Sequence, residues 1–256
     1  MVPVSLSGGV EPGARTGTSV NGRPVVVWRG QDGAARAWAD QCPHRGMRLS
    51  FGFVRDNALA CIYHGWWFSA AAAEPAGAGE PGGAGKPAGA GGPAAAGGRC
   101  LVVPAHPGIT PPARATVPAF PVAEVLGMIW VGDGPDDARP PHAPLAGPLA
   151  VHPVRSITVP APASALRAAL EAARPPGTET VETTEPPLSP HPPHPPAGGI
   201  ITFKGPSTLV IAAIQDRGDG TSTAHVVATD PGRAARRALC QWAALVRDHL
   251  AAVVLP

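Results

Sequence analysis

The sequence predicts an α+β protein that consists of an all-β N-terminal part followed by an α+β C-terminal part. Short β-like segments recur over the first half of the chain, and a long amphipathic helical pattern lies near its end. Glycine (32) and proline (34) together make up about a quarter of the 256 residues, a level at which low complexity is expected in places. We therefore expect folded parts interrupted by unstructured segments.

The N-terminal part is predicted to form one β domain over residues 1–135. Residues 19–28 and 34–39 have β-like patterns on either side of a turn at 30–33, and similar patterns return at 99–103 and 128–131. Between them, residues 70–98 contain only Ala, Gly and Pro apart from two glutamates and one lysine. No residue there is large enough to build a core, so we expect a disordered insertion within the domain.

A Pro-, Gly- and Asp-rich linker is predicted at 136–150, and a second domain at 151–256. We expect a helix at about 162–174, an irregular Pro- and Thr-rich segment at 175–199 and a long helix from about 231. Gly218-Asp219-Gly220 predicts a hairpin. The strands are expected at 154–159, 200–204, 208–215 and 221–229. The apolar face of the last helix should lie across the sheet, with Ala235, Leu239, Trp242, Val246, Leu250 and Val253.

Charge and hydropathy narrow the classes of partner. Twenty basic and eighteen acidic residues give a formal charge of +2, without a block of Lys or Arg, so no nucleic acid is expected. No apolar run approaches the roughly 20 residues that a membrane helix needs, so no membrane is expected either. The N-terminal residues lack an export pattern, which predicts a cytoplasmic protein whose cysteines are ligands or free thiols.

One motif stands out. Cys42-Pro43-His44 is followed, after sixteen residues, by Cys61-Ile62-Tyr63-His64, so two segments each offer a thiolate and an imidazole. A [2Fe–2S] cluster with two Cys on one iron and two His on the other uses this donor set. Zinc also accepts two Cys and two His, although finger-type sites pair their cysteines at short spacing. We predict Cys42, His44, Cys61 and His64 as cofactor-binding metal ligands, with zinc as the alternative.

With Pro43, Arg45-Gly46 and Gly65-Trp66 around it, this motif resembles that of the Rieske family. The similarity extends to the closing segments of the Rieske domain in oxygenase α subunits, at 99–107 and 120–131. It implies a [2Fe–2S] cluster in which the cysteines bind the inner iron. The histidines would bind the outer iron, on the side of the electron-transfer partner.

The surroundings of the motif differ from those of high-potential Rieske proteins. Met47 and Tyr63 stand where those proteins have disulfide cysteines, and Trp66 stands where they have a serine. The resemblance thus implies fewer hydrogen bonds to the cluster and a potential near about −150 mV. Trp66 and its aromatic neighbours could shield the cluster or belong to the core. Arg45 and Arg48 could form a docking surface for an acidic reductase or simply be solvated.

Rieske oxygenases also carry a helix-grip (SRPBCC/START-like) domain, which binds mononuclear iron through two His and one carboxylate. The resemblance implies a reduced version of it at 151–256. The ligand pattern of that iron, Asp-x-x-His with a second His, is missing, since no aspartate occurs between Ala138 and Gln215. We therefore expect no mononuclear Fe(II). His191 and His194, with Glu182 or Glu185, are the remaining candidates, and the prolines around both histidines favour an exposed loop.

Three functions remain open, and no catalytic residue is assigned. The first is an electron-transfer or auxiliary subunit derived from an oxygenase and lacking mononuclear iron. The second is an active Rieske monooxygenase or dioxygenase acting on a small organic substrate. The third is a redox-sensing or ligand-binding protein with a structural cluster. The expected partners are an NAD(P)H-dependent flavin or ferredoxin reductase and a complete oxygenase subunit. Cys100 and Cys240 are interpreted as small packing residues.

Overall fold

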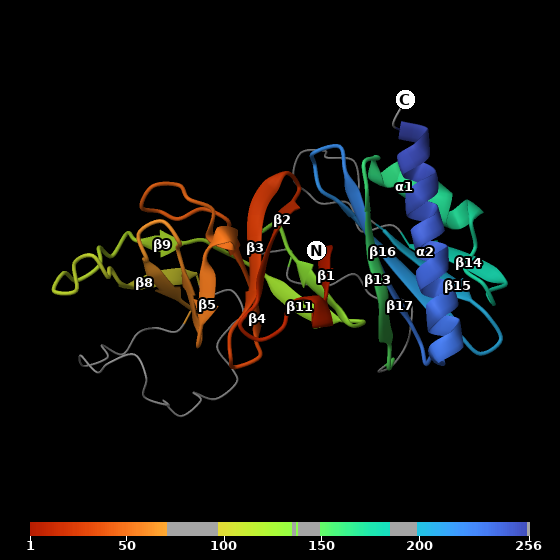
Figure 1. Ribbon diagram of the computed structural model, residues 1–256, viewed down its shortest axis with the longest axis horizontal. Helices are drawn as coiled ribbons and strands as arrows, with labels where there is room; N and C mark the ends of the chain where they lie inside the picture. Colours follow the sequence, from red (N-terminus) through yellow and green to blue (C-terminus); the bar gives the residue numbers. More distant parts are fainter. Residues whose placement is uncertain (71–96, 135–136, 138–148, 185–198, 255–256) are drawn as a thin grey trace. The chain divides into compact units, whose positions relative to one another are not determined.

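The computed structural model describes residues 1–70, 97–134, 137, 149–184 and 199–254 (Figure 1). The chain forms two compact units that do not follow the order of the sequence. The first consists of residues 1–9, 19–23 and 123–256, and the second of residues 10–18 and 24–122. The predicted boundary at 136–150 differs from this division, because residues 1–9 and 123–134 lie in the same compact unit as the C-terminal part.

The second unit contains two antiparallel sheets, apart from residues 19–23, which belong to the first unit. One sheet has the strand order β10-β4-β3-β2 and the other the order β5-β6-β7-β8-β9. The strands of the first sheet are β2 (Arg15–Val20), β3 (Arg23–Arg29), β4 (Ala35–Ala39) and β10 (Ala119–Phe120). Those of the second are β5 (Phe53–Arg55), β6 (Ala58–Ala60), β7 (Trp67–Ser69), β8 (Gly98–Val102) and β9 (Thr116–Val117). A 3-10 turn, η2 (Leu49–Phe51), precedes β5.

An Asn-Gly hairpin corrects the prediction of a single β segment at 19–28. Asn21 and Gly22 both have positive φ, of 49° and 76°, and they connect β2 to β3. Two consecutive residues in this conformation form a tight turn whose twist matches that of the flanking strands, and Asn-Gly is the dipeptide that adopts it most readily. The turn signal was present in the sequence and was missed. The predicted turn at 30–33 is confirmed, with Gly33 N–H donating to the Gly30 carbonyl.

Aromatic packing holds the core of this unit together. Trp28 and Trp38 meet edge to face with ring centroids 4.8 Å apart, and both are almost fully buried. A Cβ atom at Gly98 would lie 2.6 Å from the Trp38 ring, so a larger residue at the start of β8 would displace that ring. Cys42 and Cys61 lie in the same buried cluster. The predicted cofactor ligands are therefore attached directly to the core of the domain.

The first unit has a five-stranded antiparallel sheet of order β13-β17-β16-β15-β14. These strands are β13 (His152–Val159), β14 (Thr180–Thr184), β15 (Ile200–Lys204), β16 (Leu209–Asp216) and β17 (Ser222–Ala228). The hairpin predicted at Gly218-Asp219-Gly220 is confirmed, since Asp216 pairs with Ser222 across it. The fold is thus α+β, as predicted.

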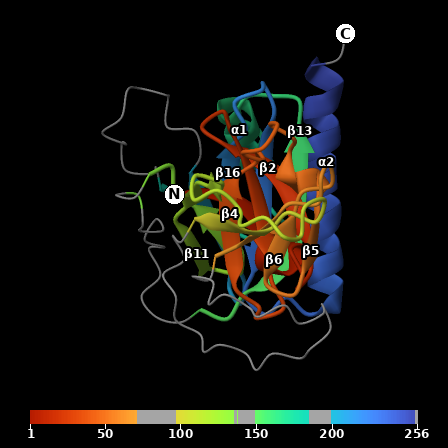
Figure 2. The ribbon, with the colours of Figure 1, turned by 90° about the vertical axis from the view of Figure 1, so that its left-hand side faces the viewer.

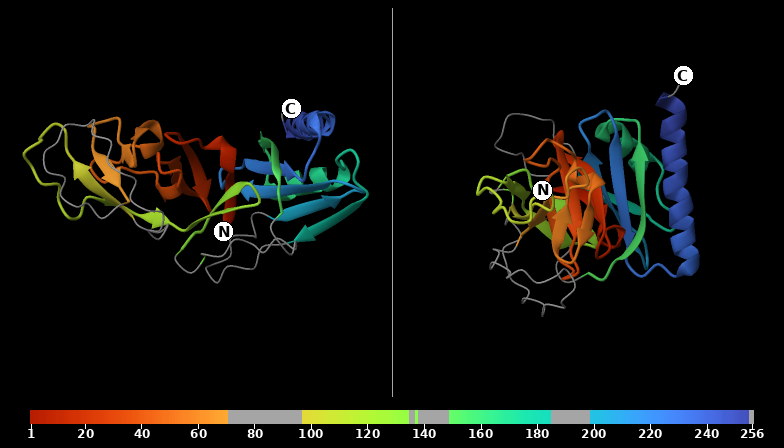
Figure 3. Two further views of the ribbon diagram at one scale, coloured as in Figure 1. Left: turned by 90° about the horizontal axis from the view of Figure 1, so that it is seen from below. Right: turned by 60° about the vertical axis from the view of Figure 1, so that its left-hand side comes forward.

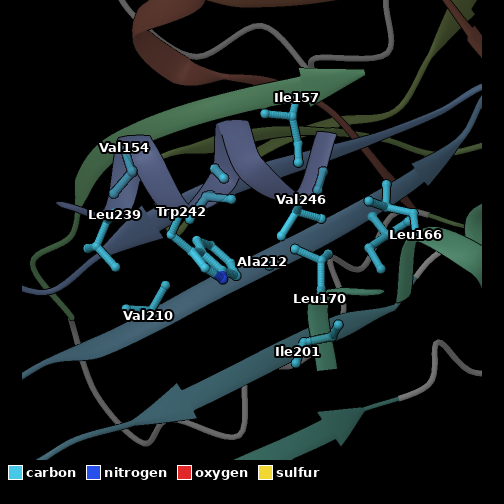
Figure 4. Packing of buried hydrophobic residues seen from close by; sticks show 14 of the residues in the cluster. Val154, Ile157, Leu166, Leu170, Ile201, Val210, Ala212, Leu239, Trp242 and Val246 are labelled. Carbon is cyan, nitrogen blue, oxygen red and sulfur yellow. The ribbon is translucent and has the colours of Figure 1, made fainter. Parts of the chain in front are cut away.

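Two helices cover one face of this sheet, α1 (Ala163–Ala172) and α2 (Arg233–Val254) (Figures 2 and 3). Leu239, Trp242 and Val246 of α2 point to the sheet together with Leu166 and Leu170 of α1 (Figure 4). The Trp242 indole donates a hydrogen bond to the Ala173 carbonyl at the end of α1 and meets Phe203 edge to face. Within the described ranges no helix is long and apolar enough to cross a membrane.

The other face of the five-stranded sheet is also covered. A three-stranded sheet of order β1-β12-β11 supplies apolar side chains that pack against Ile211 and Val227. Its strands are β1 (Val2–Leu6), β11 (Val122–Val125) and β12 (Met128–Val131), and a 3-10 turn, η1 (Ser7–Gly9), follows β1. This packing explains why residues near the N-terminus belong to the same compact unit as the C-terminal part.

Two further expectations need correction. The segment 175–199 is not irregular throughout, because Thr180–Thr184 forms β14 and pairs with β15. Four of its five residues are β-branched Thr or Val, which suits an edge strand. Ala235 shares a helix face with buried Leu239, but it lies in the first turn of α2 and is exposed. Residues 71–96 of the predicted insertion, most of the predicted linker and residues 185–198 lie outside the described residues.

Buried His225 predicts a loss of stability in acid. Burial and the charge of Arg217 lower its pKa from 6.5 to about 4, while its Nδ1 lies 2.8 Å from Ser156 Oγ. Between pH 7 and pH 5 the histidine becomes protonated in the unfolded chain but stays neutral in the folded chain. Protonation stabilises the unfolded chain, so the free energy of unfolding decreases by roughly 2 kcal/mol. Urea unfolding at both pH values should show a smaller acid loss for His225→Gln. An unchanged loss in that variant would contradict a neutral, buried His225.

Candidate metal centre

The first candidate ligand loop follows β4 and is closed by backbone hydrogen bonds. Cys42 N–H donates to the Met47 carbonyl over 2.8 Å, and Gly46 N–H donates to the Cys42 carbonyl over 2.9 Å. The chain can reverse in so few residues because Gly46 has φ of 74°, a conformation that costs glycine little. These bonds fix both ends of the loop that carries His44.

The second loop repeats this geometry between β6 and β7. Cys61 N–H donates to the Trp66 carbonyl over 2.9 Å, Gly65 N–H donates to the Cys61 carbonyl over 3.0 Å, and Gly65 has φ of 67°. The bonded positions have the same spacing from the cysteine in both loops. The histidine differs, because His44 follows its cysteine by two residues and His64 by three. The two loops therefore form an approximately symmetric pair.

The four predicted ligands separate into an inner and an outer pair. Cys42 and Cys61 are 3% and 2% exposed, and their thiols interact with each other. The imidazoles of His44, which is exposed, and His64, which is half-buried, have centroids 4.7 Å apart. The structure thus brings the two thiols together and the two imidazoles together, with the thiols on the core side and the imidazoles on the solvent side.

Desolvation shifts the pKa of Cys42 upward and the pKa of His44 downward. Burial, followed by the nearby Cys61 thiol, raises the pKa of Cys42 to about 11. Partial desolvation, then His64 and Arg45, lower the pKa of His44 below its usual 6.5, which favours the neutral imidazole that binds metals. The thiols would have to lose their protons to a metal, since only thiolate is a strong ligand.

Neighbouring segments hold the loops in place. The Asp40 carboxylate accepts hydrogen bonds from Ser50 N–H and Ser50 Oγ–H, both 2.6 Å long, and so ties the start of the first loop to the segment after it. Gly65 of the second loop lies against Pro104, since a Cβ atom there would lie 3.3 Å from the proline ring. Sequence analysis did not predict these supports, because they join residues ten to forty positions apart.

The three aromatic residues that follow Gly65 lie in three different surroundings. Trp66 stacks on His44, with centroids 4.5 Å apart and ring planes inclined by 7°. Trp67 faces Phe53 and Arg55, and Phe68 is fully buried. Sequence analysis could not distinguish them, because it did not predict that the strand begins only at Trp67 and leaves Trp66 in the loop.

The other sequence candidates lie elsewhere. The Cys100 thiol is buried and contacts the Val102 carbonyl, and that of half-buried Cys240 contacts the Val154 carbonyl. Both fit the predicted packing role. Glu182 lies on β14 and pairs with Lys204 over 2.6 Å. His191, His194 and Glu185 lie outside the described residues. In the part of the chain that the structure describes, no three His, Cys, Asp or Glu side chains surround a single metal-ion position.

Two loops of this kind, each with one cysteine and one histidine, are typical of Rieske iron–sulfur domains, and comparison with known families agrees. Residues 1–81 match the Rieske [2Fe-2S] domain. The chain therefore carries a Rieske domain, whose cofactor is a [2Fe–2S] cluster. The arrangement of donors fits that cofactor, because two buried thiols and two outward imidazoles correspond to one iron with sulfur ligands and one with nitrogen ligands.

Relatives extend this assignment to oxygenase-type proteins. The chain is 35% identical over 125 residues to Oxidoreductase NdmD of Pseudomonas putida, a match that covers 49% of this chain and 16% of NdmD. It is 49% identical over 49 residues to the vanillate O-demethylase oxygenase subunit of a Pseudomonas strain, which covers 19% of this chain and 14% of that protein. Each match thus spans less than a fifth of the relative.

Solved structures share the fold over nearly the whole chain. NdmA of Pseudomonas putida CBB5 superposes with a TM-score of 0.65 at 18% identity, covering 100% of this chain and 81% of NdmA. Apo dicamba monooxygenase superposes with a TM-score of 0.64 at 16% identity, covering 98% of this chain and 85% of that protein. At such low identity these similarities establish the fold alone.

The two loop glycines allow a matched test of loop geometry. Alanine at either position must adopt left-handed φ, at a cost of about 1–2 kcal/mol. At Gly65 the new Cβ also meets Pro104, whereas at Gly46 its nearest neighbour is the flexible end of Gln41, 3.4 Å away. We expect Gly65→Ala to lose more unfolding free energy, and more iron per chain, than Gly46→Ala. The reverse order would show that Pro104 does not constrain the second loop.

Proposed function

We propose that Cys42, His44, Cys61 and His64 hold the [2Fe–2S] cluster, and that the protein carries single electrons to or from a partner. The observation that supports this most directly is the separation of the donors into a buried pair of thiols and an outward pair of imidazoles. When bound, the cluster supplies one-electron chemistry near the protein surface. The core keeps the thiols away from water, and the loops present the imidazoles to a partner.

The residues around the loops favour a potential low in the Rieske range. Met47 and Tyr63 cannot form the disulfide of high-potential members, and Trp66 has no hydroxyl group to donate a hydrogen bond. The disulfide and the hydrogen bond from the hydroxyl group both stabilise the reduced cluster, so reduction is less favourable without them. A low potential suits an electron donor to oxygenase chemistry.

We also propose that the protein has no mononuclear iron and serves as an electron-transfer or auxiliary subunit. Between α1, α2 and the sheet, the described side chains form one apolar cluster (Figure 4). Helix α1 contains no His or Asp, and buried His225 pairs with Ser156, with which it shares the sheet face opposite the helices. A facial triad of two His and one carboxylate needs donors that the described part of this space does not offer.

An active oxygenase is the second candidate, and the sequence similarity to the vanillate O-demethylase oxygenase subunit favours it. It would require iron ligands among residues such as His191 and His194, together with a carboxylate. The helix-grip character of residues 151–256 is part of this proposal, since the antiparallel sheet crossed by α2 is consistent with it.

The proposed partner is an NAD(P)H-dependent flavin or ferredoxin reductase, with a complete oxygenase subunit as a possible acceptor. Arg45 and Arg48 are exposed on and beside the first loop, so an acidic partner surface would be attracted to the side that carries His44. Some relatives are named as chloroplastic, so the cytoplasmic location predicted for this protein is not common to all of them.

Iron and acid-labile sulfide analysis of anaerobically purified protein tests this function. We expect about two irons and two sulfides per chain, with a rhombic EPR signal after dithionite reduction. Cys42→Ser should lose both iron and sulfide, because it removes an inner ligand. Cys100→Ser is the matched control, a buried cysteine outside the loops, and should retain the cluster.

Other outcomes of that analysis would overturn parts of the proposal. A reproducible third iron, lost on replacing His191 and His194, would establish the oxygenase instead. Zinc without sulfide would exclude both iron-based functions.

A further inference from the structure

Four rings form a continuous series across the two loops. Tyr63 contacts His64 with centroids 3.9 Å apart, His64 meets His44 at 4.7 Å, and His44 stacks on Trp66 at 4.5 Å. The last contact is the most nearly parallel, with 7° between planes, against 36° and 62° for the others. Trp66 thus covers one face of His44.

Trp66 belongs to the opposite loop from the histidine that it covers. Its carbonyl accepts the Cys61 N–H, which fixes its backbone within the second loop. Its side chain is half-buried and packs against the apolar cluster that contains Cys42 and Cys61. The indole is therefore anchored at its backbone and along its side, so that it can act as a rigid platform.

Within the described residues, His44 is supported by ring contacts and not by a side-chain hydrogen bond. Metal-bound histidines commonly donate their second ring N–H to a carboxylate or carbonyl, which fixes the plane of the ring. Among the described contacts His44 makes ring contacts with His64 and Trp66 and no side-chain hydrogen bond. The torsion that sets an imidazole plane is intrinsically broad, so a stacked partner can restrict it substantially.

We propose that Trp66 is a positioning residue that fixes the ring plane of His44 and keeps water from one of its faces. This inference rests on the proposed role of His44 as a cluster ligand. Stacking at 4.5 Å with nearly parallel planes restricts rotation of the imidazole. It also limits hydration of the outer side of the cluster, where the added electron increases negative charge. Removing the indole should admit water, stabilise the reduced form and shift the potential to a more positive value.

Trp67 provides a matched control next in the chain. Its ring meets Phe53 edge to face at 6.1 Å and lies under the Arg55 guanidinium at 5.8 Å. No ring contact joins it to either histidine among the described residues. Replacing Trp67 removes a comparable indole from the same strand end without touching the His44 stack.

The test compares Trp66→Leu, Trp66→Phe and Trp67→Leu in the full-length protein. The readouts are iron and sulfide per chain, the reduction potential from a redox titration, and the EPR line shape of the reduced protein. We expect Trp66→Leu to shift the potential positively and broaden the EPR signal, or to lose iron. Trp66→Phe keeps a stacking ring and should stay close to the wild type. Trp67→Leu should leave the potential and line shape unchanged.

Several results would overturn the role of Trp66 while leaving the proposed function intact. One is a Trp66→Leu variant with wild-type potential and line shape. Another is a Trp66→Phe variant that is changed or depleted of iron as much as Trp66→Leu. A third is an equal change in Trp67→Leu, which would show a general packing effect. Absence of a cluster from the wild-type protein would instead refute the proposed function on which this inference rests.

Discussion

The hydrogen bonds that close the two ligand loops are the constraint on which the candidate site depends. In each loop the cysteine N–H donates to a carbonyl five residues later, and a left-handed glycine one residue earlier returns its N–H to the cysteine carbonyl. This arrangement buries both sulfur atoms in the apolar core and leaves both imidazoles outside. The similarity of the two loops thus arises from their backbone hydrogen bonds. Their side chains determine which cofactor they can bind.

The five-stranded C-terminal sheet is covered by apolar side chains on both faces. One face is sealed by α1 and α2, and the other by the sheet of β1, β12 and β11. Trp242 joins the end of α1 to Phe203 on the sheet, so both helices are fixed at one point. The described side chains on both faces of this sheet thus pack into apolar clusters.

Sequence reasoning recovered what is encoded locally. The strands at 128–131 and 200–204 have the predicted bounds, whereas the four ligands, which share a distinctive spacing, stay a prediction. It missed features that depend on distant partners, such as β14, which pairs with β15, and the Trp66 stack, which reaches across to the other loop. The assignment of residues 1–9 to one compact unit with the C-terminal part likewise depends on β1 pairing with β12. The hairpin at Asn21-Gly22 was readable and was overlooked.

Pulsed EPR of the dithionite-reduced protein tests the central claim most directly. Samples should be compared with natural-abundance nitrogen and with histidine labelled with ¹⁵N. If the two loops hold the cluster as inferred, nitrogen couplings from His44 and His64 appear, respond to the label, and decrease when either histidine is replaced. A reduced cluster without histidine couplings, or with couplings that survive both replacements, would contradict the account.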